Sequence, residues 1–221
     1  MSVVATLLNS TQFILVRSIQ LTRRFLTLSL VTLLTACAIT PNQVQMSADS
    51  TLRHQKHLQT NAEIRQFTLQ GRIGVQTDSK GFSGGLKWLH SSGDDNIALF
   101  SPLGSQVAQI TKSNNQITLT DANGKSVSAA NAETLTHNTL GWSLPLTGLA
   151  DWSLGRPTRG PVLASTWNEQ GLLTTLSQDG WKIEFSNYAE LNGYWLPGKI
   201  FLKSDKVNLK LLVENWDNIQ R

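Results

Sequence analysis

Apolar and polar residues alternate with a period of two along many short stretches, and this pattern constrains the fold more than any other feature. From Phe67 to Gln76 the side chains switch between apolar or small and polar, as the two faces of a half-buried strand require. The same pattern recurs at 85–90, 96–101, 106–111, 116–121, 172–177, 181–188, 199–203 and 207–216. Turn sequences such as Asn123-Gly124 and Asp179-Gly180 separate these stretches, so we expect antiparallel hairpins.

Two regions depart from this alternation and predict helices. Apolar residues at helical spacing predict an amphipathic helix that ends near Arg65; they are Leu52, Leu58, Ala62 and Ile64. Between 131 and 154 the apolar residues lie three or four apart, which predicts two short helices broken at Pro145. This order of elements favours a mainly β fold with α, in which helices cover the concave face of one strongly curved antiparallel sheet and enclose an apolar cavity.

The first 36 residues have the layout of a secretory leader. They contain Arg17, Arg23 and Arg24, no acidic residue, and an apolar stretch from 25 to 34, which is short of the roughly 20 residues of a membrane-spanning helix. The small residue Ala36 precedes Cys37, the only cysteine of the chain, so an internal disulfide is excluded. We predict that 1–36 is a lipoprotein signal peptide, that Cys37 is lipidated, that 37–50 is a flexible tether, and that 51–221 is one domain.

Charge excludes nucleic acid as a partner. Three of the 19 Lys and Arg lie in the leader, so the 185 residues after position 36 carry 16 basic and 15 acidic side chains, or +1. A chain with this balance offers no basic stripe of the kind that nucleic-acid binding requires.

Candidate reactive residues do not form a convincing active site. Gly81-Phe82-Ser83-Gly84-Gly85 matches the Gly-x-Ser-x-Gly pattern of a hydrolase nucleophile, but that motif needs a strand before it and a helix after it. We interpret the segment as the glycine-rich start of a strand. A lipid-active serine hydrolase that depends on Ser83 remains an alternative.

Metal and carboxylate chemistry are also not indicated. His54 and His57 are three residues apart, without a nearby carboxylate or cysteine, and we interpret them as a solvated helix face rather than a metal site. Asp94-Asp95 is interpreted as part of a turn rather than as a catalytic pair. We therefore expect no catalytic residue, no metal and no cofactor.

Two further features bear on function. All seven tryptophans lie after the leader, and we expect at least half of them in the core and some in a cavity wall. In Ser101-Pro102-Leu103-Gly104-Ser105 a bulky apolar residue lies at a hairpin tip, where polar residues are usual.

Four segments carry a resemblance to a known family. They are 100–105, with Pro-Leu-Gly-Ser; 145–157, which ends in Leu-Gly-Arg-Pro; 179–183; and 209–216. Together they resemble the LolB family of outer-membrane lipoprotein receptors, and the similarity covers most of the domain.

The resemblance implies an unclosed antiparallel β-barrel of the LolA/LolB type, with helices over its open side. It implies a monomer that accepts triacylated lipoproteins from a LolA-like periplasmic carrier, holds their acyl chains in an apolar cavity, and inserts them into the outer membrane without nucleotide. Because Ala38, not aspartate, follows Cys37, the resemblance also implies a lipid anchor at the periplasmic face of the outer membrane.

The resemblance assigns roles to particular residues. Leu103, flanked by Pro102 and Gly104, is expected to form the membrane-insertion loop, because its exposure would then have a mechanism. Trp88, Trp142 and Trp181 are expected to line the cavity. The alternative from another class is a structural or assembly lipoprotein that uses its sheet to bind an outer-membrane protein partner.

Overall fold

The computed structural model describes residues 47–113 and 116–221. The predictions for the leader 1–36, for Cys37 and for the tether as far as residue 46 therefore lie outside the described residues. Helix α2 begins at Ala48, before the predicted end of the tether. Every described element belongs to one compact unit, Met46–Arg221, which contains the whole sheet and the core.

The strands of the described residues form one antiparallel sheet. In chain order they are β1 (Gln66–Gln76), β2 (Gly81–Ser91), β3 (Asp94–Phe100), β4 (Gln106–Ser113), β5 (Gln116–Asp121), β6 (Ser126–Ala129), β7 (Val162–Trp167), β8 (Leu173–Gln178), β9 (Trp181–Leu191), β10 (Tyr194–Lys203) and β11 (Asn208–Gln220). Their order across the sheet is β6-β5-β4-β3-β2-β1-β11-β10-β9-β8-β7. Because β6 and β7 each pair on one side only, the barrel is unclosed, as expected.

The first and last strands join the two halves of the sheet. Leu69 pairs with Trp216, and Val75 pairs with Leu209. A register shift between Gln70 and Gly71 marks a bulge in this pairing, and a second shift follows Leu99 in the pairing of β3 with β4. Since bulges bend strands and increase their twist, they account for part of the strong curvature.

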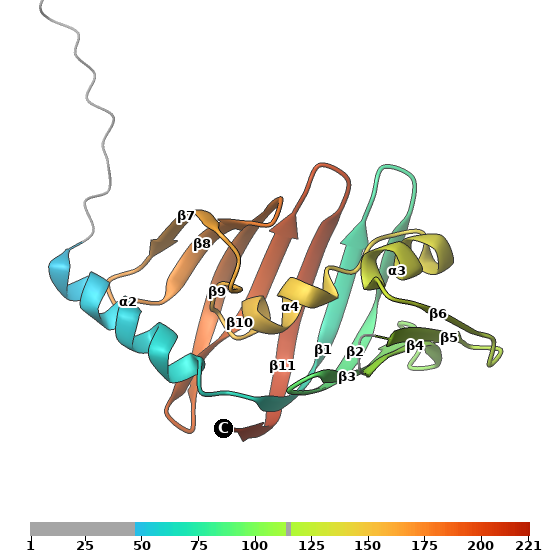
Figure 1. The fold of residues 1–221 in the computed structure, drawn as a ribbon, viewed down its shortest axis with the longest axis horizontal. Coiled ribbons are helices and arrows are strands. Elements are labelled where there is room, and N and C mark those ends of the chain that lie inside the picture. The colour runs from blue at the N-terminus through green and yellow to red at the C-terminus, as the bar shows by residue number, and fades with distance from the viewer. Residues whose placement is uncertain (1–46, 114–115) are drawn as a thin grey trace, which may run out of the picture. The chain divides into compact units, whose positions relative to one another are not determined.

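Three helices of the described residues lie across one face of this curved sheet, in the order α2, α4 and α3 (Figure 1). They are α2 (Ala48–Asn61), α3 (Ala132–Leu140) and α4 (Leu146–Ser153). Helices α2 and α4 contact β10, whereas α3 contacts β5 and β6. None of the helices within the described ranges combines the length and apolar character that crossing a bilayer requires.

The core fills the space between the concave face and the helices. Inward-facing strand residues such as Leu69, Ile97 and Ile200 belong to one buried cluster with Leu149 and Trp152 of α4. At roughly 25 cal/mol per Å² of apolar surface, this burial is the main stabilising contribution of the fold. The largest fully buried side chains include Trp88, Trp152 and Phe67.

The predicted elements are mostly confirmed, with two omissions. Strands β6 and β7 were not predicted: β6 has only four residues, β7 shows no alternation of apolar and polar residues, and most side chains of both strands are exposed. They are held by backbone pairing and by hydroxyl contacts such as Thr118–Ser128 at 2.8 Å. The two helices around Pro145 are confirmed, and the Asp179-Gly180 turn has the positive φ angles of a type I′ hairpin.

The predicted buried face of the first helix was wrong. Leu52 is 64% exposed, Leu58 is only partly buried, and Ile64 lies beyond the end of the helix at Asn61. The buried side chains of α2 are instead polar and follow helical spacing: Ser50, His54, His57 and Asn61. The helix therefore packs through hydrogen bonds and ring contacts more than through aliphatic burial.

Candidate functional site

An apolar hollow lies where the ends of β2, β3 and β4 meet the turn between α3 and α4. Its volume is about 440 Å³, and its wall includes Phe82, Leu99, Val107, Leu140 and Trp142. The rings of Phe82 and Trp142 stack at a centroid distance of 6.3 Å with 18° between their planes. Leu99 and Trp142 of this wall belong to the buried core cluster, so the hollow borders the core.

Local sequence positions the turn that borders this hollow. Asn131 caps α3 by accepting a hydrogen bond from the Thr134 amide at 2.8 Å. The buried Thr136 hydroxyl then accepts a hydrogen bond from the amide of Leu144, which fixes the connection to α4. By contrast, the first turn of α4 after Pro145 has no side-chain cap. Apart from the hydrogen bond between Leu144 and Thr136, this end of α4 is held by apolar contacts in the core.

The other end of α4 is held by polar contacts. Arg156 donates from Nε to Asp151 at 2.7 Å and also donates to the carbonyl of Asn61 at the end of α2. The buried amide of Gln178 accepts from Trp152 Nε1 at 3.1 Å and from the Thr158 amide at 2.9 Å. These bonds join α4 to α2 and β8, so we expect the α3–α4 end of the helical layer to move more readily.

The three predicted cavity tryptophans occupy different environments. Trp142 lines the apolar hollow. Trp88 is fully buried in the core cluster and donates from Nε1 to Asp95 at 2.8 Å. Trp181, at the start of β9, is partly buried against the core. Their contact with acyl chains stays a prediction.

Phe82 and Leu140 are wall residues that sequence reasoning missed. Phe82 lies two, four and six residues before positions 84, 86 and 88, all of which are buried. The parity of the strand was therefore the signal that could have placed Phe82 on the inner face.

The predicted insertion loop projects from the tip of the β3–β4 hairpin. Leu103 is 95% exposed, and the loop that carries it is closed by hydrogen bonds from Ser101 N to Ser105 O at 2.8 Å and from Gly104 N to Ser101 O at 2.9 Å. Gly104 has a φ of +89°, a conformation that glycine adopts without strain. The tip therefore presents an apolar side chain on a defined turn.

The nucleophile geometry that Ser83 would need does not occur at that position. Strand β2 runs from Gly81 to Ser91, and Ser83 pairs with Gly74 within the sheet. No helix follows the serine, so the strand-turn-helix elbow is not formed there. Its interpretation as the start of a strand is confirmed.

The interpretation of Asp94-Asp95 as a turn was wrong for Asp95. This residue is buried within β3, where its Oδ1 contacts His90 Nδ1 at 2.7 Å and its Oδ2 lies 3.8 Å from Lys112 Nζ. It shares parity with the buried Ile97 and Leu99, which could have revealed its inward direction. The cluster orients Trp88 and joins the ends of three strands.

The interpretation of the two helix histidines as solvated was also wrong. His54 donates from Nδ1 to the Gly171 carbonyl at 2.8 Å and stacks on Trp167 at 4.2 Å. His57 packs edge-on against Tyr188 at 6.1 Å. A Cβ at Gly171 would lie 2.4 Å from the backbone nitrogen of His54, so only glycine lets this loop approach α2 so closely.

Burial decides the protonation of this helix face. Desolvation, together with the neighbouring His54, lowers the pKa of His57 to about 4. Desolvation also lowers the pKa of His54 and raises the pKa of Tyr188. Within the described ranges, no group of three or more His, Cys, Asp or Glu residues is placed to hold a metal ion.

Comparison with known sequences gives a consistent result. The family described as "LolB: Outer membrane lipoprotein LolB" matches residues 65–216. The protein named "Outer-membrane lipoprotein LolB" of Pseudomonas savastanoi pv. phaseolicola is 31% identical over 195 residues, covering 88% of this chain and 95% of its own. That of Nitrosococcus oceani is 34% identical over 175 residues, covering 79% and 87%.

Solved structures are similar at the level of the fold. A DUF1329 family protein from Desulfovibrio piger aligns with a TM-score of 0.50 and 8% identity, covering 77% of this chain and 91% of its own. A LolA superfamily protein from Nitrosomonas europaea aligns with a TM-score of 0.45 and 12% identity, covering 76% and 93%.

Proposed function

Since this chain belongs to the family of the outer-membrane lipoprotein LolB, we propose that it accepts triacylated lipoproteins from a LolA-like periplasmic carrier and inserts them into the outer membrane. The chain is an outer-membrane lipoprotein. We propose further that Cys37 carries its lipid anchor and that 1–36 is removed. Acceptance from the carrier and insertion into the membrane need no nucleotide, because each transfer of the acyl chains is downhill in free energy.

The apolar hollow beside Trp142 is the observation that carries the proposal. The hollow opens beside the core. On the concave side of the sheet, this core is covered by helices and not by a second sheet (Figure 1). Acyl chains need concave apolar walls and no reactive groups. The hollow supplies such a wall, and it adjoins the end of α4 that has no side-chain cap.

The size of the ligand requires the helical layer to move. Three acyl chains contain roughly 40 methylenes, and if each takes about the volume of a water molecule, roughly 30 Å³, they need roughly 1,200 Å³. The hollow offers about 440 Å³. We therefore infer that α3 and the first turn of α4 shift outward on uptake, while Arg156 and Gln178 hold the other end.

The cost of exposing acyl chains to water explains why they must pass directly from one binding protein to the next. At about 0.8 kcal/mol for each methylene, exposure of the three chains to water would cost on the order of 30 kcal/mol. The receptor must therefore receive the chains directly from the carrier. Net transfer to the membrane follows if the receptor binds the acyl chains more tightly than the carrier does and more weakly than the bilayer does.

Leu103 supports the insertion step of the proposal. An isolated exposed leucine usually has no special meaning, but here the loop that bears it is fixed by hydrogen bonds and holds the side chain 95% exposed. Burial of a leucine in the acyl region stabilises membrane contact by roughly 1.5–3 kcal/mol. The loop would thus bring the loaded receptor to the bilayer surface.

The transfer reaction itself tests the proposed function. The soluble domain, residues 38–221, would be mixed without nucleotide with a carrier loaded with a labelled triacyl lipoprotein, and the distribution of label measured at equilibrium. We expect most of the label on the domain. If the label stays on the carrier although circular dichroism shows a folded domain, the receptor function is refuted.

The exposed edge of the sheet favours one second candidate, a structural lipoprotein that binds an outer-membrane protein. Edge strand β7 exposes Val162 and Leu163, and free edges can pair with another chain. Failure of lipoprotein transfer, combined with co-purification of a stoichiometric membrane protein that Leu163→Lys abolishes, would support this candidate instead.

A further inference from the structure

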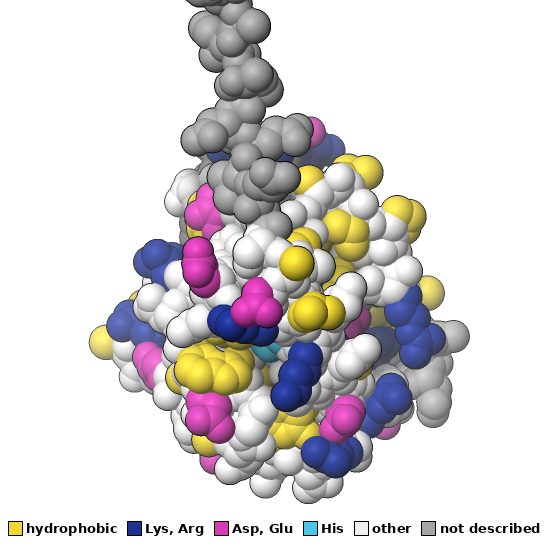
Figure 2. Space-filling view, turned by 90° about the vertical axis from the view of Figure 1, so that its left-hand side faces the viewer, with side chains coloured by type: hydrophobic (Ala, Val, Ile, Leu, Met, Phe, Trp, Pro, Cys, Tyr) yellow, Lys and Arg dark blue, Asp and Glu magenta, His cyan; other side chains and the backbone are white. Residues whose placement is uncertain are grey.

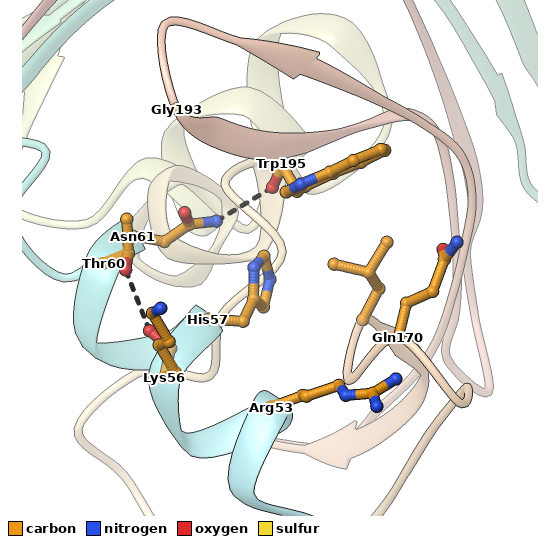
Figure 3. Close-up of a pocket in the computed structure, with 9 residues that line it drawn as sticks. Arg53, Lys56, His57, Thr60, Asn61, Gln170, Gly193 and Trp195 are labelled. Carbon is orange, nitrogen blue, oxygen red and sulfur yellow. Dashed lines mark hydrogen bonds between the residues drawn. The ribbon is translucent and has the colours of Figure 1, made fainter. Parts of the chain in front are cut away.

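A second concave site, here called the α2 pocket, lies between α2 and the β9–β10 turn. Its volume is about 440 Å³, and the residues that matter below are Arg53, Lys56, His57, Asn61, Gln170 and Trp195. Figure 3 shows the His57 ring projecting from α2 into the space that the other side chains surround. In Figure 2, a histidine is visible in a hollow between basic side chains on this face.

The rim of the α2 pocket is basic. Arg53 and Lys56 are three residues apart on α2, and no acidic side chain lines the pocket. The Arg53 guanidinium is held by Asp49 at 2.8 Å and by the Glu169 carbonyl at 3.1 Å, which leaves further N–H groups free. Lys56 forms no ion pair with any residue in the described ranges, so its three donors are available.

The floor of the pocket contains polar atoms without partners. Within the described part of the chain, His57 Nε2 and Asn61 Oδ1 are buried and accept or donate no hydrogen bond. As whole residues, His57 and Asn61 are 8% and 0% exposed. Asn61 Nδ2 already donates to the carbonyls of Leu154 and Trp195, so its oxygen is an acceptor that a ligand hydroxyl would satisfy.

An apolar surface adjoins these polar groups. Trp195 is 41% exposed at the pocket wall, and Leu52 is 64% exposed one helical turn before Lys56. Indole rings, exposed leucines and cations together are typical of surfaces that contact lipid headgroups. Residues 38–46, which join α2 to the proposed anchor at Cys37, span at most about 30 Å when fully extended, so α2 stays near the membrane.

We propose that the α2 pocket binds the headgroup of an anionic phospholipid that carries free hydroxyls, of the phosphoglycerol class. The phosphate accepts hydrogen bonds from Lys56 and Arg53, and a glycerol hydroxyl donates to Asn61 Oδ1. The start of the acyl chains lies against Trp195. This site is separate from the hollow beside Trp142 and needs no lipoprotein client.

Binding of a short-chain lipid below its micelle concentration tests the proposal. The soluble domain, residues 38–221, would be titrated by calorimetry with dihexanoyl phosphatidylglycerol. We expect saturable binding at one site, weakened about tenfold by Lys56→Gln. The matched control is Lys125→Gln, which removes another exposed lysine and should leave affinity unchanged. Equal affinity in the Lys56 and Lys125 variants, both with the thermal midpoint of the parent domain, would overturn the site.

Three further ligands identify the source of the phosphate. Dihexanoyl phosphatidylcholine keeps the phosphodiester but has no hydroxyl, so it should bind at least tenfold more weakly. Glycerol 3-phosphate and inorganic phosphate lack the acyl chains and should also bind more weakly. If glycerol 3-phosphate bound as tightly as the lipid, the pocket would belong to a soluble phosphate ester, and the lipid assignment would be overturned.

Discussion

Leu103 is exposed to solvent at the tip of the β3–β4 hairpin. A substitution there can therefore test the proposed insertion of lipoproteins separately from their binding. The side chain is 95% exposed, so a substitution removes almost no packing from the folded domain. Any functional effect must then arise from a contact outside the domain. A substitution of Leu103 therefore tests the proposed membrane contact directly.

We predict that Leu103→Glu blocks release of lipoproteins into membranes and leaves their uptake intact. The free energy of unfolding should change by less than about 0.5 kcal/mol, whereas release into liposomes should fall at least about tenfold because a leucine contact is lost and a charge is added. Leu163→Glu is the matched control, since Leu163 is also exposed at 78%. Normal release by the Leu103 variant, or equal loss in both variants, would contradict the role of the loop.

His57 gives the domain a measurable dependence on pH. Its pKa is about 4 in the folded protein and 6.5 in the unfolded chain, so the unfolded chain binds the proton first as the pH falls. The contribution of His57 to the free energy of unfolding should therefore have its full value above about pH 6.5. It should decrease toward pH 4, by up to about 3 kcal/mol. His54, whose pKa is also lowered, acts in the same direction.

Urea unfolding at pH 7 and at pH 4.5 measures this effect. We predict that His57→Gln loses much less stability between these two values than the parent domain loses. The other titrating groups are present in both proteins, so their contribution cancels in the comparison. An identical loss in both proteins would show that His57 is not buried in its neutral form.

At the scale of elements, the polar junction at the end of α4 decides which part of the helical layer moves. Arg156 joins Asp151 of α4 to the carbonyl of Asn61 at the end of α2. Gln178 reaches the same region from β8. The opposite end, at the α3–α4 turn, is held by the hydrogen bond from the Leu144 amide to the Thr136 side chain and by apolar contacts around Trp142.

We predict that Arg156→Ala loosens α4 and destabilises the domain by about 1–3 kcal/mol, since it removes the donor to the Asp151 carboxylate and one of the two hydrogen bonds that the Asn61 carbonyl accepts. Arg156→Lys should recover only part of this loss because an ammonium does not reproduce the two-sided guanidinium geometry. Hydrogen exchange of α4 amides and urea unfolding would report the two effects. Unchanged exchange in α4 would show that the junction does not hold the helix.

Local patterns could predict elements that have one buried face. The alternation at 67–76 predicts β1, and the Asp179-Gly180 dipeptide predicts the β8–β9 turn, because both signals are local in sequence. Strands β6 and β7 could not be predicted, since exposed edge strands need no apolar face. The pairing of β1 with β11 likewise joins segments more than 130 positions apart, which no local pattern records.

The candidate sites were predictable only where one residue carries the signal. Leu103 is recognisable because a leucine between proline and glycine is unusual at a hairpin tip. The buried face of α2 was missed because its partners are distant backbone carbonyls of Gly171, Leu154 and Trp195. A histidine or asparagine that satisfies such carbonyls has the same sequence appearance as an exposed one.

At the scale of the whole molecule, the proposed function assigns anchoring and lipoprotein transfer to separate parts of the chain. The sheet and the core lie within 46–221, whereas Cys37 precedes them. We predict that Cys37→Ala, expressed with its own leader, moves the protein from the membrane fraction to the soluble fraction. Transfer from a loaded carrier should persist. Continued membrane fractionation would refute lipidation at this residue.

The two free edges of the sheet set how the interior can respond to its ligands. In a closed barrel, the number and stagger of the strands fix the radius, so the capacity of the interior is constant. Here β6 and β7 end the sheet without pairing to each other, and a small change in twist at each strand alters the curvature. We expect such an elastic container to accommodate acyl chains of different lengths on clients that share nothing else.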